Sequence, residues 1–134
     1  MTLNAAVSPP SEDLPMTMPN FATHLALAQM DLGPFVAKPT SIEGNQSEAS
    51  VDLWTSPDGR VALGVWECTP GRFTADRAGS TEFCHFLSGR VEMTHPDGSV
   101  QAFGPGDAIT LPQGWKGVWR VVEQVRKIYV ITQG

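Results

Sequence analysis

The sequence predicts an all-β sandwich or barrel. Short runs rich in Val, Ile, Thr and aromatic residues recur about every ten residues, and turn signals separate them. The 13 glycines and 11 prolines are spread along the chain, as expected for strands joined by tight turns. A length of 134 residues with 41% apolar side chains suffices for one core, so we expect a single domain.

The N-terminal region differs from the rest of the chain. Residues 1–20 mix Pro, Ser, Asp and Glu with few bulky apolar side chains, so we expect an arm there and the folded domain at residues 21–134. The apolar spacing within residues 21–36 fits a short helix, but part of it also alternates like a strand. The pattern leaves both open.

Turn motifs divide the remainder into strands. Residues 55–59 and 95–98 each join two β-rich runs through a Pro-Asp-Gly sequence, in which Pro fixes φ and Gly supplies positive φ. We expect Gly89 and residues 112–114 to end strands. The expected strands are residues 51–54, 61–68, 82–87, 91–94, 99–103, 108–111, 117–122 and 127–132.

Charge and composition exclude several classes of partner. A formal charge of −5 without a Lys/Arg cluster argues against nucleic acid. No apolar run reaches the roughly 18 residues of a membrane span, and the first residues lack the features of a secretory signal. We therefore expect a cytoplasmic protein without a membrane partner, in which Cys68 and Cys84 are free thiols.

Two motifs carry a family resemblance. Glu82 and Gly89 are separated by six residues, and residues 106–114 contain Gly, five residues, Pro, one residue and Gly. These motifs resemble the two signature motifs of the cupin superfamily. The chain between Gly64 and Ile131 is more specifically similar to the small cupins related to (S)-ureidoglycine aminohydrolase and the ethanolamine-utilisation Q protein.

The resemblance implies a double-stranded β-helix, the jelly-roll or cupin barrel, with an N-terminal extension. Glycine-rich joints fall where such a barrel turns sharply between paired strands, which agrees with this fold. Cupin barrels often pair through their sheets or through exchanged N-terminal arms, so the resemblance also implies a homodimer.

The resemblance further shows which metal ligands are missing. Metal-binding cupins carry His, one residue, His, then three or four residues and Glu, with another His three residues after the second motif. The first two positions hold Asp76 and Ala78, or Ala75 and Arg77 with the longer spacing, and the last position holds Gly117. Glu82 alone cannot hold a mid-row metal tightly, so we expect no metal cofactor.

The chain's own histidines offer no obvious replacement. His24 lies in the ambiguous N-terminal segment, and strand alternation turns His85 away from Glu82. His95 lies in a turn that we expect to be remote from the motif. A substitute site of Asp76, Glu82 and Cys84 stays open as an alternative, although a cysteine at such a position is more often a small buried hydrophobe.

The alternation of side chains along the expected strands indicates the candidate catalytic residues. Lys127 and Tyr129 share one face of the last expected strand, and we expect Glu82 to face them across the barrel. A carboxylate, an ammonium and a phenol in an apolar barrel form either a polar network or a metal-free acid/base site. The alternatives are an ion pair that only fixes strand register and a Lys127 that extends to solvent.

Three further residues are candidates for ligand binding. Trp119 has the parity of Gly117 and therefore points inward with it, and Cys84 has the parity of Glu82. Arg72 leaves a turn towards the barrel mouth, where it meets an anionic group or solvent. The four tryptophans suit ligand stacking, core packing or a dimer interface.

Three hypotheses of function follow. The first is a small-molecule-binding cupin of uncertain activity, which the missing histidines favour. The second is a metal-independent or weakly metal-dependent enzyme on a small nitrogenous or carbonyl compound, as the ureidoglycine aminohydrolase resemblance implies. The third is a non-catalytic interaction protein.

Overall fold

Strands dominate residues 20–134, the part of the chain that the computed structural model describes. The arm expected at residues 1–20 therefore lies, except for its last residue, outside the described residues. The elements are η1 (Leu27–Gln29), β1 (Val36–Ala37), β2 (Ser41–Glu43), β3 (Ser47–Thr55), β4 (Val61–Cys68), β5 (Gly71–Asp76), β6 (Ser80–Thr94), β7 (Val100–Phe103), β8 (Ala108–Leu111) and β9 (Lys116–Gln133). The prediction of an all-β fold is confirmed.

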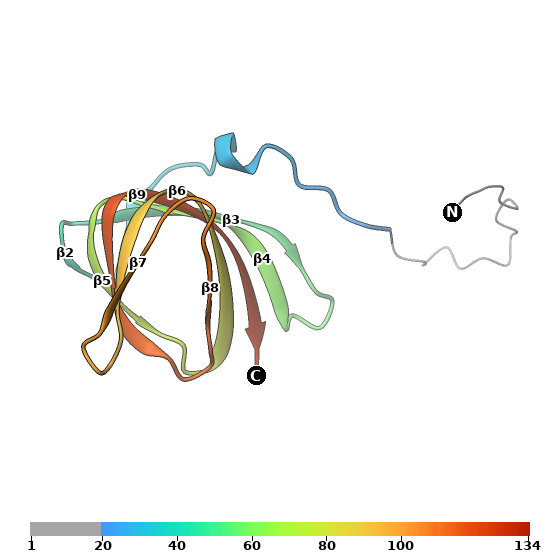
Figure 1. Ribbon diagram of the computed structural model, residues 1–134. Helices are drawn as coiled ribbons and strands as arrows, with labels where there is room; N and C mark the ends of the chain where they lie inside the picture. The colour runs from blue at the N-terminus through green and yellow to red at the C-terminus, as the bar shows by residue number, and fades with distance from the viewer. Residues whose placement is uncertain (1–19) are drawn as a thin grey trace, which may run out of the picture.

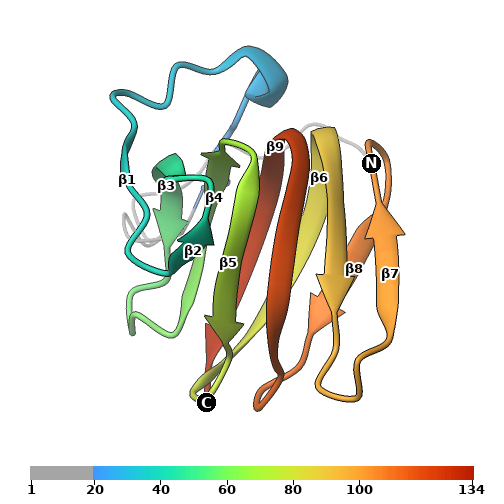
Figure 2. The same ribbon diagram turned by 90° about the vertical axis from the view of Figure 1, so that its left-hand side faces the viewer.

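The two longest strands, β6 and β9, organise the barrel. They pair antiparallel with each other over most of their length. The first half of β6 also pairs with β8 and its second half with β7, while the first half of β9 pairs with β5 and its second half with β4. Two curved layers result, with β1, β3, β4 and β8 in one and β2, β5 and β7 in the other (Figures 1 and 2). This is the expected jelly-roll cupin barrel.

Each of these long strands was predicted as two shorter strands, which is wrong. Gly89 was expected to end a strand, but β6 continues through it with a local shift of register. At Gly89 φ is 86°, and a Cβ atom there would lie 2.2 Å from the carbonyl oxygen of Gln124. The glycine therefore bends β6 against β9. Strand β9 likewise continues between the expected segments, with Glu123 opposite Arg90.

The segment before β1 is neither the helix nor the strand that its pattern allowed. It contains one 3₁₀ turn, η1, which follows Ala26 in the left-handed conformation, with φ 54°. Leu32 packs with Val65 on the outer face of β3 and β4. Arg126 of β9 donates to the carbonyl of Leu27 at 2.7 Å. These contacts fix the segment on the outside of the barrel.

The barrel interior is partly filled and partly hollow. Side chains of β6 and β9 such as Phe86, Met93 and Val121 form an apolar core. Beside this core lies an open cavity of about 990 Å³, lined by residues of β3, β4, β5, β6 and β9 and of adjoining loops. Within residues 20–134 no helix has the length and apolar character to cross a membrane.

Candidate functional site

A buried ion pair lies in the wall of the cavity. Lys127 of β9 donates from Nζ to Oε2 of Glu82 on β6 at 2.8 Å, and the two residues are 5% and 7% exposed. Arg77, just after β5, donates from Nη1 to the other oxygen of Glu82 at 3.2 Å. Both oxygens of this carboxylate are therefore held by cations.

The pair stays charged at neutral pH. Burial by itself raises the pKa of Glu82, but the nearby Lys127 and then Arg77 more than offset it and hold the pKa below 4.5. Burial also works against the ammonium of Lys127, but Glu82 reverses this effect and raises the pKa above 10.5. The interior of this barrel thus contains a true ion pair.

Aromatic rings surround the ammonium of Lys127. Its Nζ lies 4.4 Å from the ring centroid of Trp66 and 4.3 Å from that of Trp119. Phe73 stacks on Trp119 with centroids 5.5 Å apart and meets Trp66 edge-on at 5.9 Å. The negative faces of these rings stabilise a cation that burial has removed from water.

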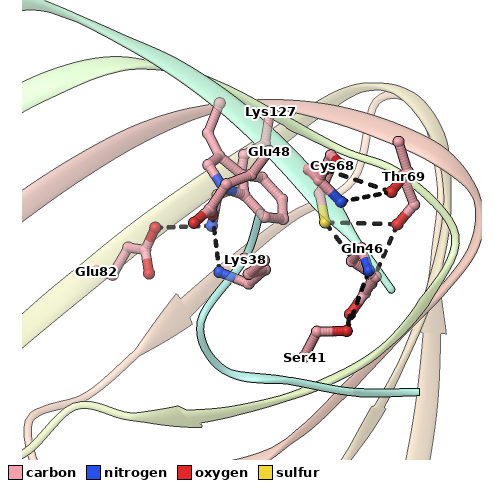
Figure 3. Close-up of polar contacts among 10 residues, drawn as sticks. Lys38, Ser41, Gln46, Glu48, Cys68, Thr69, Glu82 and Lys127 are labelled. Carbon is pink, nitrogen blue, oxygen red and sulfur yellow. Dashed lines mark hydrogen bonds and ion pairs between the residues drawn. The ribbon is translucent and has the colours of Figure 1, made fainter. Parts of the chain in front are cut away.

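A second ammonium, which the sequence analysis did not single out, lies against the same rings. Lys38, which follows β1, donates to Oε1 of Glu48 at 2.8 Å and lies 4.2 Å from the centroid of Phe73 and 5.6 Å from that of Trp66. Trp66 donates from Nε1 to the same oxygen of Glu48 at 2.9 Å. Figure 3 shows Lys38, Glu48, Lys127 and Glu82 converging on one place.

Buried Gln46 holds the loop that carries Lys38. The backbone N–H of Lys38 donates to the carbonyl of Gln46 at 2.9 Å. The side-chain amide of Gln46, 2% exposed, donates to the carbonyl of Thr69 at 3.0 Å and accepts from Ser41 at 3.0 Å (Figure 3). These bonds place Lys38 over the cavity although it lies in a loop.

The hydroxyl of Tyr129 forms a hydrogen bond within the barrel wall. It donates to the carboxylate of Asp52, and Gly64 lies between them because Asp52, Gly64 and Tyr129 occupy one row across β3, β4 and β9. A Cβ atom at Gly64 would lie 2.4 Å from the hydroxyl oxygen. Burial and Asp52 raise the pKa of Tyr129, so the phenol stays protonated.

The structure brings together four of the six predicted site residues. Glu82, Lys127, Tyr129 and Trp119 all line the cavity. Cys84 is fully buried and is not part of the lining, and burial raises its pKa to about 12.

Arg72, the sixth predicted residue, lies apart from the cavity. Its exposed side chain reaches Glu43 at 3.3 Å, in an ion pair between β5 and β2. The turn after Cys68 was expected to direct it to the barrel mouth, but on β5 the inward-facing neighbour is Phe73.

At two positions where metal-binding cupins carry a histidine ligand, this chain has residues with other structural roles. Arg77 binds Glu82, as described above. At Gly117 a Cβ atom would lie 2.4 Å from both the indole of Trp115 and the carbonyl oxygen of Thr94. Trp115 donates from Nε1 to Nδ1 of His95 at 3.1 Å, which fixes the indole over this glycine.

The position of His95 was also predicted wrongly. It was expected to be remote from the motif, but it follows directly on β6 and lines the cavity with its neighbours Thr94 and Pro96. Its Nδ1 accepts from Trp115, so its Nε2 carries the proton, and Nε2 donates to Gln101 at 2.6 Å.

These residues do not fit a resident metal. Among residues 20–134 no three His, Cys, Asp or Glu side chains come together as ligands. The alternative site of Asp76, Glu82 and Cys84 is not formed either, since Asp76 faces Lys116 at 4.0 Å on the surface. Around Glu82 the neighbouring charges are an ammonium and a guanidinium, which a metal ion would have to displace.

Comparison with models of protein families shows to which family the chain belongs. The family model of the EutQ-like cupin domain matches residues 55–129. The chain belongs to the EutQ-like cupin family. A search among curated proteins gave no match.

Solved structures agree with this EutQ-like cupin assignment. The EutQ protein of Clostridium difficile is 25% identical, with 66% of this chain and 69% of that chain covered and a TM-score of 0.58. A protein of unknown function from Pseudomonas syringae is 24% identical with a TM-score of 0.65; the match covers 75% of this chain but 45% of that one. Ectoine synthase from P. lautus is 17% identical, with 72% and 67% covered and a TM-score of 0.58.

The last two similarities show the fold alone. The specific relation to (S)-ureidoglycine aminohydrolase stays a prediction. The cavity of this EutQ-like cupin brings two lysines, an arginine and three aromatic rings together around Glu82 and Glu48. Such a set can bind a small polar molecule and orient it against the rings.

Proposed function

We propose that this cupin binds a small polar molecule in its barrel cavity and uses the Glu82–Lys127 pair, without a resident metal, to recognise it. The observation that carries the proposal is the ionised pair in the wall of a cavity of about 990 Å³. Ligand sites are typically cavities of about 300–1,000 Å³ in which a few polar groups converge among apolar walls.

The pKa values favour binding over acid/base catalysis. A general acid or base works best when its pKa lies near the working pH. Here the pKa of Glu82 is lowered, and those of Lys127 and Tyr129 are raised. Each group therefore keeps one protonation state around neutrality, which suits a fixed pattern of donors and acceptors.

A metal-independent enzyme on a small nitrogenous or carbonyl compound is the second candidate. It is supported by the presence of Glu82, Lys127 and Tyr129 in one cavity. In such an enzyme Glu82 is the base, because it is the ionised carboxylate of the three. An activity that disappears in Glu82→Gln while ligand affinity is retained would favour this candidate.

A thermal-shift screen tests the binding proposal. Small polar compounds are added to the wild type and to the double variant Glu82→Gln/Lys127→Met, which removes both charges together. We expect compounds that raise the melting temperature of the wild type and not that of the double variant. Arg120→Gln/Glu92→Gln, which removes an exposed ion pair outside the cavity, is the control and should respond as the wild type does.

Failure of every compound to shift the wild type would contradict the proposal and favour an interaction protein. Metal analysis gives an independent check. Protein purified without chelators should contain far less than one Mn, Fe, Ni or Zn ion per chain, and near one ion per chain would overturn the metal-free proposal.

We also propose a homodimer. Phe83 of β6, Val130 of β9 and Leu63 of β4 form one row on the outer face of the barrel, and Phe83 is 42% exposed. A second copy that covers this row would remove it from water. Light scattering should give twice the chain mass, and Phe83→Glu should give the monomer; a wild-type monomer would contradict the dimer.

The cytoplasm remains the proposed location. Cys68 and Cys84 are both free and buried, as is usual for proteins of a reducing compartment. Cell fractionation would test this location.

A further inference from the structure

We propose that the ligand carries a carboxylate, and that this group binds between the ammonium groups of Lys38 and Lys127 and the guanidinium of Arg77. This inference rests on the proposed binding function and specifies its ligand class. It follows from hydrogen-bond donors, charge and the way in which the aromatic rings are already used.

Lys38 and Lys127 each have N–H donors that their carboxylate partners do not use. An ammonium has three N–H donors. Lys127 gives one to Glu82, and Lys38 gives one to Glu48. Beyond these, the thiol of Cys84 is a weak acceptor next to Lys127, and the ring faces accept no ordinary hydrogen bond. A buried donor without an oxygen partner is costly, so each ammonium favours a further acceptor from the cavity side.

Arg77 adds a planar set of donors at the same place. Its guanidinium uses Nη1 on Glu82 at 3.2 Å, and its side chain, 25% exposed, also lines the cavity. A guanidinium presents five N–H donors in a fork that matches the two oxygens of a carboxylate. Arg77 and Lys127 thus meet at Glu82, and both line the cavity with donors beyond those that Glu82 uses.

The local charge favours an anion. Around the rings three cations, Lys38, Arg77 and Lys127, face two carboxylates, Glu48 and Glu82. Lys116 adds a fourth cation to the lining, and Asp52 and Asp76 add two carboxylates, so the excess of one cation is confined to the residues around the rings. One anionic group from a ligand would balance the cluster.

The aromatic walls disfavour a cationic ligand. Aromatic cages commonly bind ammonium ligands through the negative faces of the rings. Here the faces of Trp66 and Trp119 already hold the chain's own Lys127, and that of Phe73 holds Lys38. A cationic ligand would have to displace these lysines and would be repelled by them. The ring edges that remain suit the apolar part of a carboxylate.

Three matched probes test the inference. Benzoate, benzamide and benzylammonium share one ring and differ in the charge of the head group. Binding is followed by the indole N–H signals in NMR, because Trp66 and Trp119 line the cavity whereas Trp54, 41% exposed, lies outside it and is an internal control. We expect benzoate to shift the signals of Trp66 and Trp119 and to bind at least about tenfold more tightly than the other two.

Variants identify the residues responsible. Lys38→Met/Glu48→Gln removes one cation and one anion, so the net charge is unchanged, and Arg77→Gln alters a partly exposed residue. Each should weaken benzoate at least about tenfold. The matched control is Arg120→Gln/Glu92→Gln, an exposed ion pair outside the cavity, which should bind benzoate as the wild type does.

Equal or tighter binding of benzamide or benzylammonium would overturn the carboxylate inference and leave the binding proposal intact. Unchanged benzoate affinity in both site variants would overturn it as well. If none of the three probes binds, the inference fails, and the thermal-shift screen then decides separately whether the cavity binds any small molecule.

Discussion

Lys127 and Glu82 form their ion pair diagonally across β9 and β6. In the register of these strands Lys127 lies opposite Phe86, and Glu82 lies opposite Ile131. The 2.8 Å contact therefore spans the row of Cys84 and Tyr129 that lies between them. The barrel curl and the length of the lysine side chain make this contact, rather than direct strand pairing.

A double-mutant cycle should show strong coupling between these two residues. Lys127→Met leaves Glu82 buried beside Arg77 alone, so we expect a loss of about 3–5 kcal/mol in the free energy of unfolding. The double variant Glu82→Gln/Lys127→Met should lose at least about 1 kcal/mol less than the sum of the single losses. Urea denaturation measures both quantities. Additive losses would show that the pair contributes nothing as a pair.

The acid side of the stability profile should depend on Glu82. Its pKa is below 4.5 in the folded protein, so its contribution is complete above that pH and is lost as the pH falls through the folded value. Stability of the wild type should therefore fall more steeply below about pH 4.5 than that of Glu82→Gln/Lys127→Met. The lowered pKa values of Asp58 and Asp97 are common to both proteins and cancel. The lowered pKa of Glu48, to which Lys127 contributes, adds to the same difference. Parallel profiles would contradict this prediction.

On the alkaline side Lys127 should have the opposite effect. Its folded pKa is above 10.5, so its contribution is complete below that pH and is lost as the pH rises through the folded value. Chemical denaturation at alkaline pH, compared with the same double variant, measures this loss. A wild-type profile that declines well below pH 10.5 relative to the double variant would contradict it.

Restoring a histidine at Gly117 should not restore a metal site. Any side chain there meets Trp115 and the backbone of Thr94, so Gly117→His and Gly117→Ala should each cost about 1–3 kcal/mol. Gly79→Ala, where a Cβ atom meets nothing within 4 Å, is the control and should stay near wild type. Tight nickel or zinc binding by a well-folded Gly117→His protein, measured by calorimetry, would overturn our view of this position.

Both thiols should be unreactive in the folded protein. Burial raises the pKa of Cys68 to about 11 and that of Cys84 to about 12, and the thiolate is the reactive form. At pH 8 we expect iodoacetamide to label them at least about 100-fold more slowly without denaturant than in urea. Mass spectrometry gives the rates. Rapid labelling of Cys84 in the native protein would show that it is open to the cavity.

Local sequence signals correctly located much of the fold and the inward face of its long strands. The Pro-Asp-Gly turns at residues 55–59 and 95–98 join paired strands, because turn chemistry is contained in a few adjacent residues. Strand parity placed Glu82, Trp119 and Lys127 inside, because alternation depends only on position along an extended chain.

Only the tertiary structure decided how these side chains meet. Lys38 comes from a loop without a strand pattern, and its place over Trp66 depends on the buried amide of Gln46. The continuity of β6 through Gly89 depends on the approach of β9, which no local pattern encodes.

The sequence by itself thus determined the all-β class, the turns at residues 55–59 and 95–98, and the inward position of Glu82, Trp119 and Lys127. The curl of the barrel determined that Lys127 reaches Glu82 and that Trp115 covers Gly117. The physical reason is the distance along the sequence over which each feature is determined. Turns and side-chain alternation depend on a few adjacent residues. The contacts of Lys127 and Trp115 join strands that are distant along the chain and need the complete register of the sheet.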